Sequence, residues 1–535
     1  MFNQLQFGSE ARKSLLEGVE VVYQAVASTL GPKATNVAID REYGSPTVLQ
    51  DGVSVAKAID RLEDKFQNMG AQLIKQAASR TNDVVGDGTT TSIVLARAIA
   101  VEAHQAISAG ANAMMVRRGI EAAVERLLIQ LDRIATPITT KEETENVAII
   151  SAQNKEIGQM VATAVERMGK DGVIAVEESG SSDFSIEYKD GMAFDKGYTS
   201  RYFVTDAEKQ EAVLEDPYIL VTDKKIDNLP EFVAFADMFG KATNGAPIVI
   251  IAESIGEKPL EILAINTFKG NIKALAIEAP GYGEYRKAVL EDIAVLTGAT
   301  FITADMGSRL DSVTVEQLGR AKRITSTATS TLIVDGLGGV DSIASRVESL
   351  QNQLEKTTRD FDRERLQERL AKLSSGIAII NVGAVSEAEM REKKERVIDA
   401  IAATKAAKDA GIVPGGETAL LRVSDSLNDI KLPEQEQIGV EIVRRAITQP
   451  FKRLMENSGY EPGEMIALFK SEALSKNNYG IDVIDGKVKD LVASGVIDPV
   501  KVTRSALKNA SSVAIMIITT NTLISYEKGT TEERN

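Results

Sequence analysis

Two glycines, one acid and three hydroxyl side chains stand together in VVGDGTTTSIVLARAIA, which begins at Val84. Gly86 and Gly88 allow the backbone to approach a ligand closely. Thr89–Thr91 begin a helical pattern, where free amides favour an anion. Asp87 would repel a bare phosphate, so it fits best as a Mg²⁺ ligand that leaves room for phosphate oxygens. A turn followed by a helix N-cap explains the same residues, and the P-loop pattern GxxxxGK[ST] is absent.

The stretches TLGPK and QDGVSVA also combine ligand-type residues with a helix end. In TLGPK, a helix that ends at Gly31 exposes carbonyl groups that suit a monovalent cation, and Pro32 offers an apolar plate for a purine. In QDGVSVA, Asp51 stands between a strand pattern and a helical pattern, where its carboxylate could lie beside a phosphate. A helix stop and an Asp-Gly turn are the ordinary explanations.

Two further candidates lie toward the C-terminus. Asp399, in the helical run REKKERVIDAIAATK, is either a solvated helix residue or a general base for attack by water. Gly415 and Gly416, in IVPGGETAL, permit close backbone approach to a ligand or form a linker turn. All these candidates lie in the two flanking segments and none so clear lies in the middle, which indicates a ligand but names no function.

The composition excludes several kinds of chemistry. The 535 residues include no cysteine and one histidine, His104, so thiolate sites, cysteine nucleophiles and multi-histidine zinc sites are excluded and carboxylates remain as bases and metal ligands. A net charge of −15 argues against a general binder of nucleic acid or acidic membranes. No apolar run approaches the roughly 18 residues of a membrane span. The N-terminal residues lack the apolar core of a signal peptide, so a cytoplasmic protein is expected, or an organelle protein whose leader has been removed.

Hydrophobic periodicity gives the chain similar ends and a different middle. Apolar residues recur at helical spacing between Leu15 and Leu30, and helical patterns continue to about residue 134. From about 191 to 376, YILVTD, APIVIIAE, IKALAIEAP and ATFITAD predict buried strands of an α/β domain with a largely parallel sheet. Two charged helical runs at its end predict a hairpin, and KVTRSALKNASSVAIMIITT predicts a helix that passes into a strand. Because the two terminal segments are alike and the middle differs, we expect a middle domain inserted into a second domain that is formed by both terminal segments.

Several stretches stand together in the order found in a known family: TLGPK, DGVSVAK, LEDKFQNMGAQL, NDVVGDGTTT, APGYGEYRKAVLEDIAVLTG, EMREKKERVIDA and DPVKVTRSAL. From about Phe7 to about Thr520 the chain resembles the group I chaperonins of the GroEL type. The resemblance implies a multidomain α + α/β fold. A mostly helical equatorial domain would comprise residues 1–134 and 411–535, a small α/β intermediate domain 135–190 and 377–410, and an inserted α/β apical domain 191–376.

The resemblance also implies an ATP site with Mg²⁺ and K⁺ as cofactors. Asp399 would be the carboxylate that activates water, with Asp51 on the phosphate side; Asp87 would bind Mg²⁺, and Thr29 and Gln50 would serve K⁺. The residues implied to bind the nucleotide are Thr29, Leu30, Gly31, Pro32, Asp51, Gly86, Asp87, Gly88, Thr89, Thr90, Thr91, Ile150, Ser151, Gly415, Gly416, Tyr479, Asp482 and Asp498. Two positions depart from the family: Gln50 stands where relatives often carry Lys, and Asp482 where many carry a small residue.

The middle domain is implied to bind non-native chains and a co-chaperonin lid through apolar side chains. The implied positions are Tyr198, Tyr202, Phe203, Val233, Leu260, Ala264 and Ile265. By spacing alone, Leu260, Ala264 and Ile265 form one helical face, which is more often core than binding site. The segment Ala236–Ala246 is longer than in relatives.

The implied function is ATP-dependent folding of non-native polypeptides under a co-chaperonin lid, by seven-membered rings stacked in pairs. Nucleotide would close the intermediate domain and carry Asp399 to the γ-phosphate. Neither nucleic acid nor membrane is expected as a partner. Two other classes stay open: a monomeric ATPase or kinase that acts on a small molecule, and a passive scaffold without hydrolysis.

Overall fold

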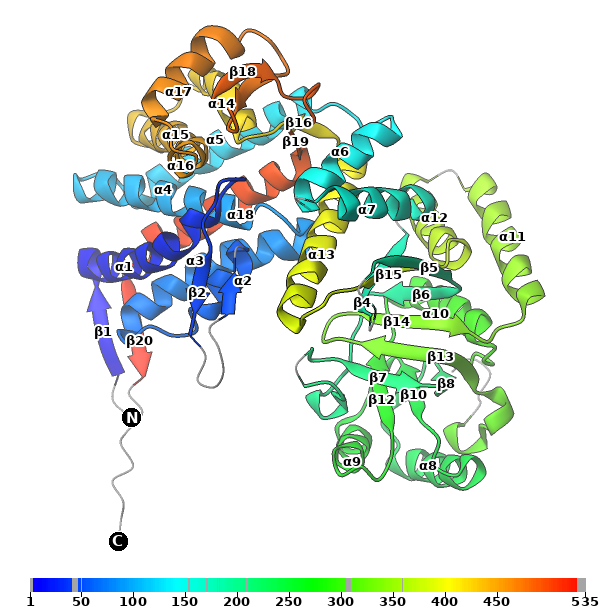
Figure 1. Cartoon of the computed structure of the whole chain (residues 1–535). Coiled ribbons are helices and arrows are strands. Elements are labelled where there is room, and N and C mark those ends of the chain that lie inside the picture. The colour runs from blue at the N-terminus through cyan, green and yellow to red at the C-terminus, as the bar shows by residue number, and fades with distance from the viewer. Residues whose placement is uncertain are drawn as a thin grey trace. The chain divides into compact units, whose positions relative to one another are not determined.

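The computed structural model describes residues 3–40, 47–49, 51–152, 154–169, 172–179, 181, 183–207, 209–303, 309–357 and 359–526. The chain forms two compact units: unit 1 comprises residues 1–166 and 384–535, and unit 2 comprises residues 167–383. Unit 1 therefore contains both ends of the chain (Figure 1). The predicted multidomain α + α/β class is confirmed, whereas the boundaries of three domains stay a prediction. No described helix is long and apolar enough to cross a membrane.

Helices make up most of unit 1. The longer ones are α1 (Gly8–Val26), α3 (Lys65–Val85), α4 (Thr89–Ser108), α5 (Ala113–Ile134), α6 (Lys141–Ala152), α13 (Glu387–Ala410), α15 (Glu434–Ala446) and α18 (Val500–Thr519). The shorter ones are η1 (Ala27–Thr29), α2 (Gly52–Ala58), α14 (Thr418–Val423), η5 (Ser424–Asp429), α16 (Gln449–Asn457) and α17 (Pro462–Leu468), and α7 (Lys155–Met168) runs across the boundary of the units.

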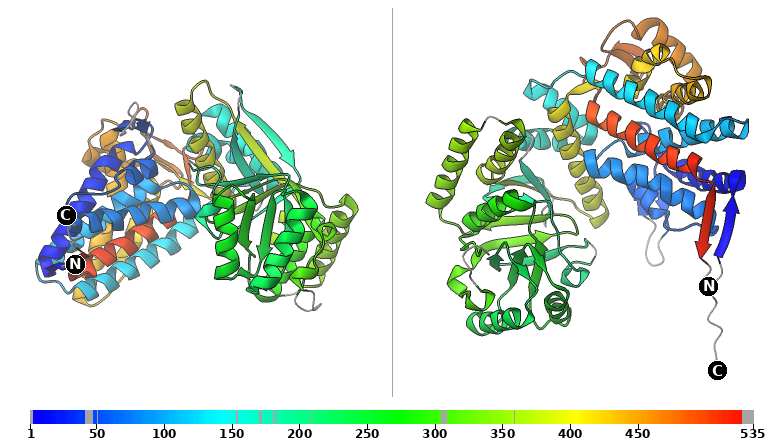
Figure 2. Two further views of the ribbon diagram at one scale, coloured as in Figure 1. Left: turned by 90° about the horizontal axis from the view of Figure 1, so that it is seen from below. Right: turned by 180° about the vertical axis from the view of Figure 1, so that it is seen from behind.

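Short strands of unit 1 pair two by two, antiparallel. The pairs are β1 (Asn3–Phe7) with β20 (Thr522–Tyr526), β2 (Val37–Ile39) with β3 (Thr47–Leu49), β16 (Ile412–Pro414) with β19 (Ile497–Pro499), and β17 (Tyr479–Asp482) with β18 (Lys487–Asp490). The pairing of β1 with β20 places the two ends of the described chain side by side (Figure 2).

The core of unit 1 lies between α1, α3, α4, α5, α15 and α18. Close crossing of α1 and α3 requires glycine, because a Cβ at Gly18 would lie 1.7 Å from the Gln67 carbonyl oxygen and one at Gly70 would lie 1.9 Å from that of Leu15. The prediction of a strand at the end of α18 is wrong. Val513, Ala514 and Ile517 share one buried face of a continuous helix, so the apolar run packs at helical spacing.

Unit 2 is built on a seven-stranded sheet in the order β12-β10-β8-β13-β14-β6, with β7 also paired to β13. The strands are β6 (Gly191–Phe194), β7 (Ala212–Glu215), β8 (Tyr218–Val221), β10 (Ile248–Ala252), β12 (Ala274–Glu278), β13 (Gly319–Ser326) and β14 (Thr331–Gly336). A smaller sheet pairs β15 (Ile377–Val382) with β4 (Val173–Glu178) in parallel and with β5 (Ser185–Lys189) in antiparallel, and β9 (Lys225–Ile226) pairs with β11 (Ser254–Ile255).

The prediction of a largely parallel sheet holds only for β8, β10 and β12, because the rest of the large sheet is antiparallel. In ATFITAD, the described part forms a single bridge from Ile302 to Thr222. The helices of unit 2 are α8 (Leu229–Thr243), α9 (Glu257–Phe268), α10 (Gly283–Thr297), α11 (Val340–Lys356) and α12 (Asp360–Ser374), with η2 (Arg201–Phe203), η3 (Leu310–Ser312) and η4 (Val315–Gln317). The predicted helical hairpin is α11 and α12, which contact each other.

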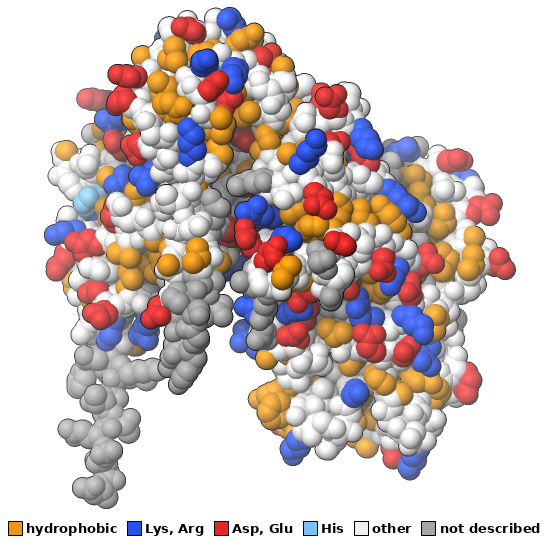
Figure 3. All heavy atoms as spheres, in the orientation of Figure 1, with side chains coloured by type: hydrophobic (Ala, Val, Ile, Leu, Met, Phe, Trp, Pro, Cys, Tyr) orange, Lys and Arg blue, Asp and Glu red, His pale blue; other side chains and the backbone are white. Residues whose placement is uncertain are grey.

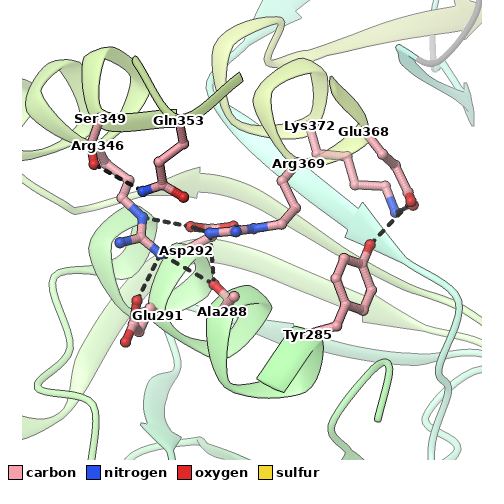
Figure 4. A network of polar contacts seen from close by, with 10 residues as sticks. All are labelled: Tyr285, Ala288, Glu291, Asp292, Arg346, Ser349, Gln353, Glu368, Arg369 and Lys372. Atoms are coloured by element: carbon pink, nitrogen blue, oxygen red, sulfur yellow. Dashed lines mark hydrogen bonds and ion pairs between the residues drawn. The ribbon is translucent and has the colours of Figure 1, made fainter. Parts of the chain in front are cut away.

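A buried ion network joins this hairpin to α10 (Figure 4). Asp292 of α10 is 1% exposed and accepts from Arg346 Nε of α11 and from Arg369 Nε of α12, each at 2.7 Å. Glu291, which is more exposed, also pairs with Arg346, at 2.8 Å. The buried Asp292 carboxylate therefore bridges two guanidinium groups, and Glu291 supplies the second negative charge that balances them.

We expect Asp292→Ala to cost about 3–5 kcal/mol, because it leaves two guanidinium groups without their buried partner. Hydrogen–deuterium exchange of the whole protein should show faster exchange of the α11 and α12 amides. Glu291→Ala is the matched control, since it removes the exposed partner of the same arginine and should cost less than about 1 kcal/mol. Equal exchange in the two variants would contradict the role given to Asp292.

Candidate functional site

The turn between α3 and α4 is shaped by two glycines in the left-handed region, Gly86 at φ 68° and Gly88 at φ 77°. Both also lie in close contacts: a Cβ at Gly86 would lie 2.2 Å from the Ala402 Cβ, and one at Gly88 would lie 2.6 Å from Val502 Cγ1. Because Gly88 is the N-cap and has no side chain, it leaves the first-turn amides of this 20-residue helix without a side-chain cap. The free amides of Thr89–Thr91, in the first turn of α4, are therefore available to bind an anion.

The loops after α1 and before α2 meet this turn. The Thr29 and Thr90 hydroxyl oxygens lie 3.1 Å apart. A Cβ at Gly52 would lie 2.1 Å from Thr90 Oγ1, so the start of α2 also packs directly on the threonines. Asp51 caps α2 by accepting from the Val53 and Ser54 amides, at 3.1 and 2.7 Å. Three of the predicted stretches are thus brought together in unit 1.

The sequence predicted that carbonyl groups at the end of α1 would hold a monovalent cation. The Ala27 carbonyl accepts from Arg453 and Asn457, and the Leu30 carbonyl accepts from Asn457 at 2.9 Å. These carbonyls are therefore already engaged by side chains. Gly31, at φ 93°, and Pro32 complete the predicted turn, and Gln50 lies outside the described residues.

Asp399 lies on α13, close to the turn between α3 and α4 that carries Asp87. Ala402, the residue that touches Gly86, is one helical turn further along α13. Burial, together with the carboxylates of Asp87, Asp51 and Glu395, raises the pKa of the Asp399 carboxyl to about 9. The hydrolytic candidate and the phosphate-side acids are therefore within electrostatic reach of one another.

Asp87 itself keeps access to solvent, so a ligand can reach it. Loss of hydration among the surrounding groups raises the pKa of the Asp87 carboxyl; the Gly88 N–H, which donates to this group, lowers it, and the nearby Asp51 raises it. Among the described residues no group of three His, Cys, Asp or Glu side chains could hold a metal ion alone. A single accessible carboxylate beside a phosphate cradle nevertheless fits Mg²⁺, which takes one or two carboxylates together with phosphate oxygens and water.

Gly415 and Gly416 lie beside Asp498, across the antiparallel pair β16 and β19. A Cβ at Gly415 would lie 3.1 Å from Asp498 Oδ1, so glycine lets the two approach. Burial, together with the nearby Asp87, raises the pKa of the Asp498 carboxyl to about 7. The C-terminal candidates thus face the same acids as the N-terminal ones.

Sequence reasoning missed Glu417, the residue after the glycine pair. The Thr91 hydroxyl donates to the Glu417 carboxylate. Burial raises the pKa of this carboxyl, the Thr91 hydroxyl lowers it, and Asp498 and Asp87 raise it, so that it lies at about 8. The one indication in the sequence is that Glu417 directly follows Gly415-Gly416, a pair that predicts a ligand by its glycines alone.

Tyr479 and Asp482 lie in the β17–β18 hairpin. Arg422 of α14 donates to the Tyr479 carbonyl and fixes the hairpin to the helix that follows the glycine pair. The Asp482 carboxylate accepts from Lys489 at 2.8 Å and from the Ile484 amide at 2.9 Å. It is therefore engaged within its own hairpin.

Ile150 and Ser151 lie on α6, which packs against α13. The Ser151 hydroxyl is buried and has no hydrogen-bond partner among the described residues. A polar ligand group would satisfy it.

Unit 2 carries a different feature, an exposed apolar face on α9 and its neighbours. It comprises Tyr202, Val233, Ile262, Ile265 and Phe268. Phe268 is 73% exposed, and its ring lies 5.4 Å from that of Tyr202. Figure 3 shows hydrophobic side chains at the surface over the end of unit 2 that carries α8 and α9.

The predicted apolar positions divide into surface and core. Tyr202, Val233 and Ile265 belong to the exposed face, and Ile262 and Phe268 join it although the sequence did not single them out. Phe203 and Ala264 are buried in the core of unit 2, and Tyr198 and Leu260 are partly buried against it. In this conformation these four residues therefore belong to the core of unit 2 or pack against it, and they are not part of the exposed face.

A model of the TCP-1/cpn60 chaperonin family matches residues 22–234 and 241–528. The gap between the matched ranges lies within α8 and overlaps the segment Ala236–Ala246. Among solved structures, the chain is similar to the chaperonin gp146 from bacteriophage EL 2 (Pseudomonas aeruginosa), determined in the presence of ATP-BeFx. The TM-score is 0.74 at 22% identity, over 98% of this chain and 99% of that chain.

Proposed function

The chain belongs to the TCP-1/cpn60 chaperonin family, and from this premise we propose that it is an ATP-driven chaperonin that binds non-native polypeptides and folds them under a co-chaperonin lid. The observation that carries the ATP part is the α4 turn: a helix start without a side-chain cap, with an accessible carboxylate before it and Asp399 beside it. We also propose a cytoplasmic location.

In this proposal the phosphates take the amides and hydroxyls of Thr89–Thr91, where the helix dipole favours negative charge. Asp87 and the phosphates would share Mg²⁺, which would supply positive charge between them. K⁺ would bind near Thr29, at oxygens other than the Ala27 and Leu30 carbonyls, which side chains already engage. The hairpin of β17 and β18 and the Gly415-Gly416 turn lie on the side assigned to ribose and adenine, with Asp498 as the ribose acid.

Asp399 is the proposed general base for the attacking water, because a carboxylate is the base that a nearly histidine-free chain can supply. A base must be deprotonated. A carboxyl with a pKa of about 9 holds its proton at neutral pH, and a nearby cation would lower that pKa. Catalysis would therefore start only when the cation and the phosphates are in place.

The apolar face on α9 is the proposed binding surface for exposed apolar segments of client chains. Nucleotide binding would move this unit so that clients are exchanged for the lid, which couples two distinct sites by domain motion. The net charge of −15 fits a polar cavity wall that repels acidic, soluble clients.

We expect rings rather than monomers in solution. A chain of 57.6 kDa would give roughly 400 kDa for one seven-membered ring and roughly 800 kDa for a stacked pair. Light scattering with and without ATP, followed by negative-stain imaging, measures this. A species of one chain mass under all conditions would exclude the ring and favour a small-molecule ATPase.

Asp399→Ala should keep ATP binding and lower turnover by roughly a hundredfold or more, because it removes the base and leaves the cradle. Binding is measured by calorimetry and turnover by phosphate release. Glu392→Ala is the matched control, an exposed carboxylate on the same helix paired with Arg396. Unchanged turnover in Asp399→Ala would remove its catalytic role, and no turnover in the wild type would favour a passive scaffold.

Phe268→Ser should weaken capture of a chemically unfolded protein by roughly tenfold, because an exposed aromatic anchor is lost, while ATP hydrolysis persists. Phe361→Ser is the matched control, since Phe361 is a comparably exposed phenylalanine of α12 in the same unit. Equal capture by both variants would show that clients bind elsewhere.

A further inference from the structure

Glu417 adopts a backbone conformation that its side chain disfavours. Its φ is 58°, in the left-handed region, and among the described residues of unit 1 it is the only non-glycine residue with a positive φ. Such strain persists where the surroundings impose it and is found preferentially at ligand sites. Glycine would relieve it at this position.

The Glu417 side chain does not serve its own helix. It stands at the N-cap of the six-residue helix α14, yet it makes no cap hydrogen bond there. It accepts instead from the Thr91 hydroxyl at the third residue of α4, a helix from a distant part of the sequence. The strained residue thus reaches into the first turn of the helix assigned to phosphate.

Thr91 has one hydroxyl proton to donate, and Glu417 holds it. A phosphate group at the α4 first turn would take the same proton. Above the Glu417 pKa of about 8 it would also meet a negative charge that adds to those of Asp498 and Asp87. Both effects oppose a phosphate at this place.

We propose that Glu417 is an internal competitor of the nucleotide phosphates: it occupies the Thr91 hydroxyl in the nucleotide-free chain and must give it up when a nucleoside di- or triphosphate binds. This inference rests on the proposed function of the α4 turn. It assigns Glu417 a role in weakening nucleotide binding, so that bound nucleotide leaves more readily.

The experiment compares the assembled wild type with Glu417→Gln and Glu417→Gly by calorimetric titration with ADP in excess Mg²⁺, at a pH above the Glu417 pKa of about 8, where its carboxyl is ionised. Glutamine keeps the size and the strain but removes the charge, and glycine removes the competitor and the strain together. ADP should bind roughly tenfold more tightly to both variants than to the wild type. Glu417→Gly also guards against a folding defect, because glycine suits the backbone at this position.

Titration with adenosine distinguishes an effect on phosphate binding from a general change in the structure of the site. Adenosine has no phosphate, so its affinity should be the same in the wild type and in Glu417→Gln. Asp425→Asn is the charge-matched control, an exposed acid on η5, and should leave the ADP affinity unchanged. Equal or weaker ADP binding by Glu417→Gln, or equal tightening for adenosine, overturns the competitor role. A wild type that binds no ADP overturns the proposed function itself.

Discussion

The cost of ionising the carboxyl groups gathered at the start of α4 is the constraint on which the site depends. Asp51, Asp87, Asp399, Glu417 and Asp498 come from separate segments of unit 1, and burial together with neighbouring carboxylates raises the pKa of the last three to about 9, 8 and 7. Such a cluster is unfavourable by itself, because each charge raises the cost of the next. It becomes favourable when cations and hydrogen-bond donors enter with a ligand. The cluster thus lowers the stability of the ligand-free fold, and ligand binding at the same place offsets this loss.

Glycine makes this gathering possible. At Gly86 and Gly88 the backbone needs a positive φ, and neighbouring helices leave no room for a Cβ, since Ala402 of α13 and Val502 of α18 lie within 2.6 Å of where it would be. The same turn therefore receives α13, which carries Asp399, and α18, which follows Asp498. A side chain larger than hydrogen at Gly86 would push α13 away and separate the hydrolytic candidate from the phosphate cradle. Packing and chemistry are fixed by the same two residues.

The sequence predicted the parts of the site that depend on local residue type and could not predict those that depend on packing. Helix starts, glycine turns and isolated acids are local, so the stretches around Asp51, Asp87, Asp399 and Gly415 could be named, and the family resemblance joined them. Burial is not local. Phe203 and Ala264 are core residues, while Phe268 projects from α9, and helical spacing cannot distinguish the two when both faces are apolar. The large sheet was misjudged because buried parallel and antiparallel strands give similar apolar runs, and Glu417 was missed because strain has no sequence pattern.

Linkage connects these features to the proposed cycle. A ligand shifts a conformational equilibrium only by its differential affinity for the two states. In the conformation described here α13 lies on the Gly86 turn, which adds Asp399 and Glu395 to the acids around Asp87. Without a cation this closed arrangement increases the repulsion; with Mg²⁺ and phosphates it supplies a base where one is needed. The cation that enters with the nucleotide would therefore favour closure by offsetting the charge of these acids, and loss of the cation after hydrolysis would weaken that preference. On this argument the acids that make the empty site costly are also what makes closure of α13 depend on nucleotide.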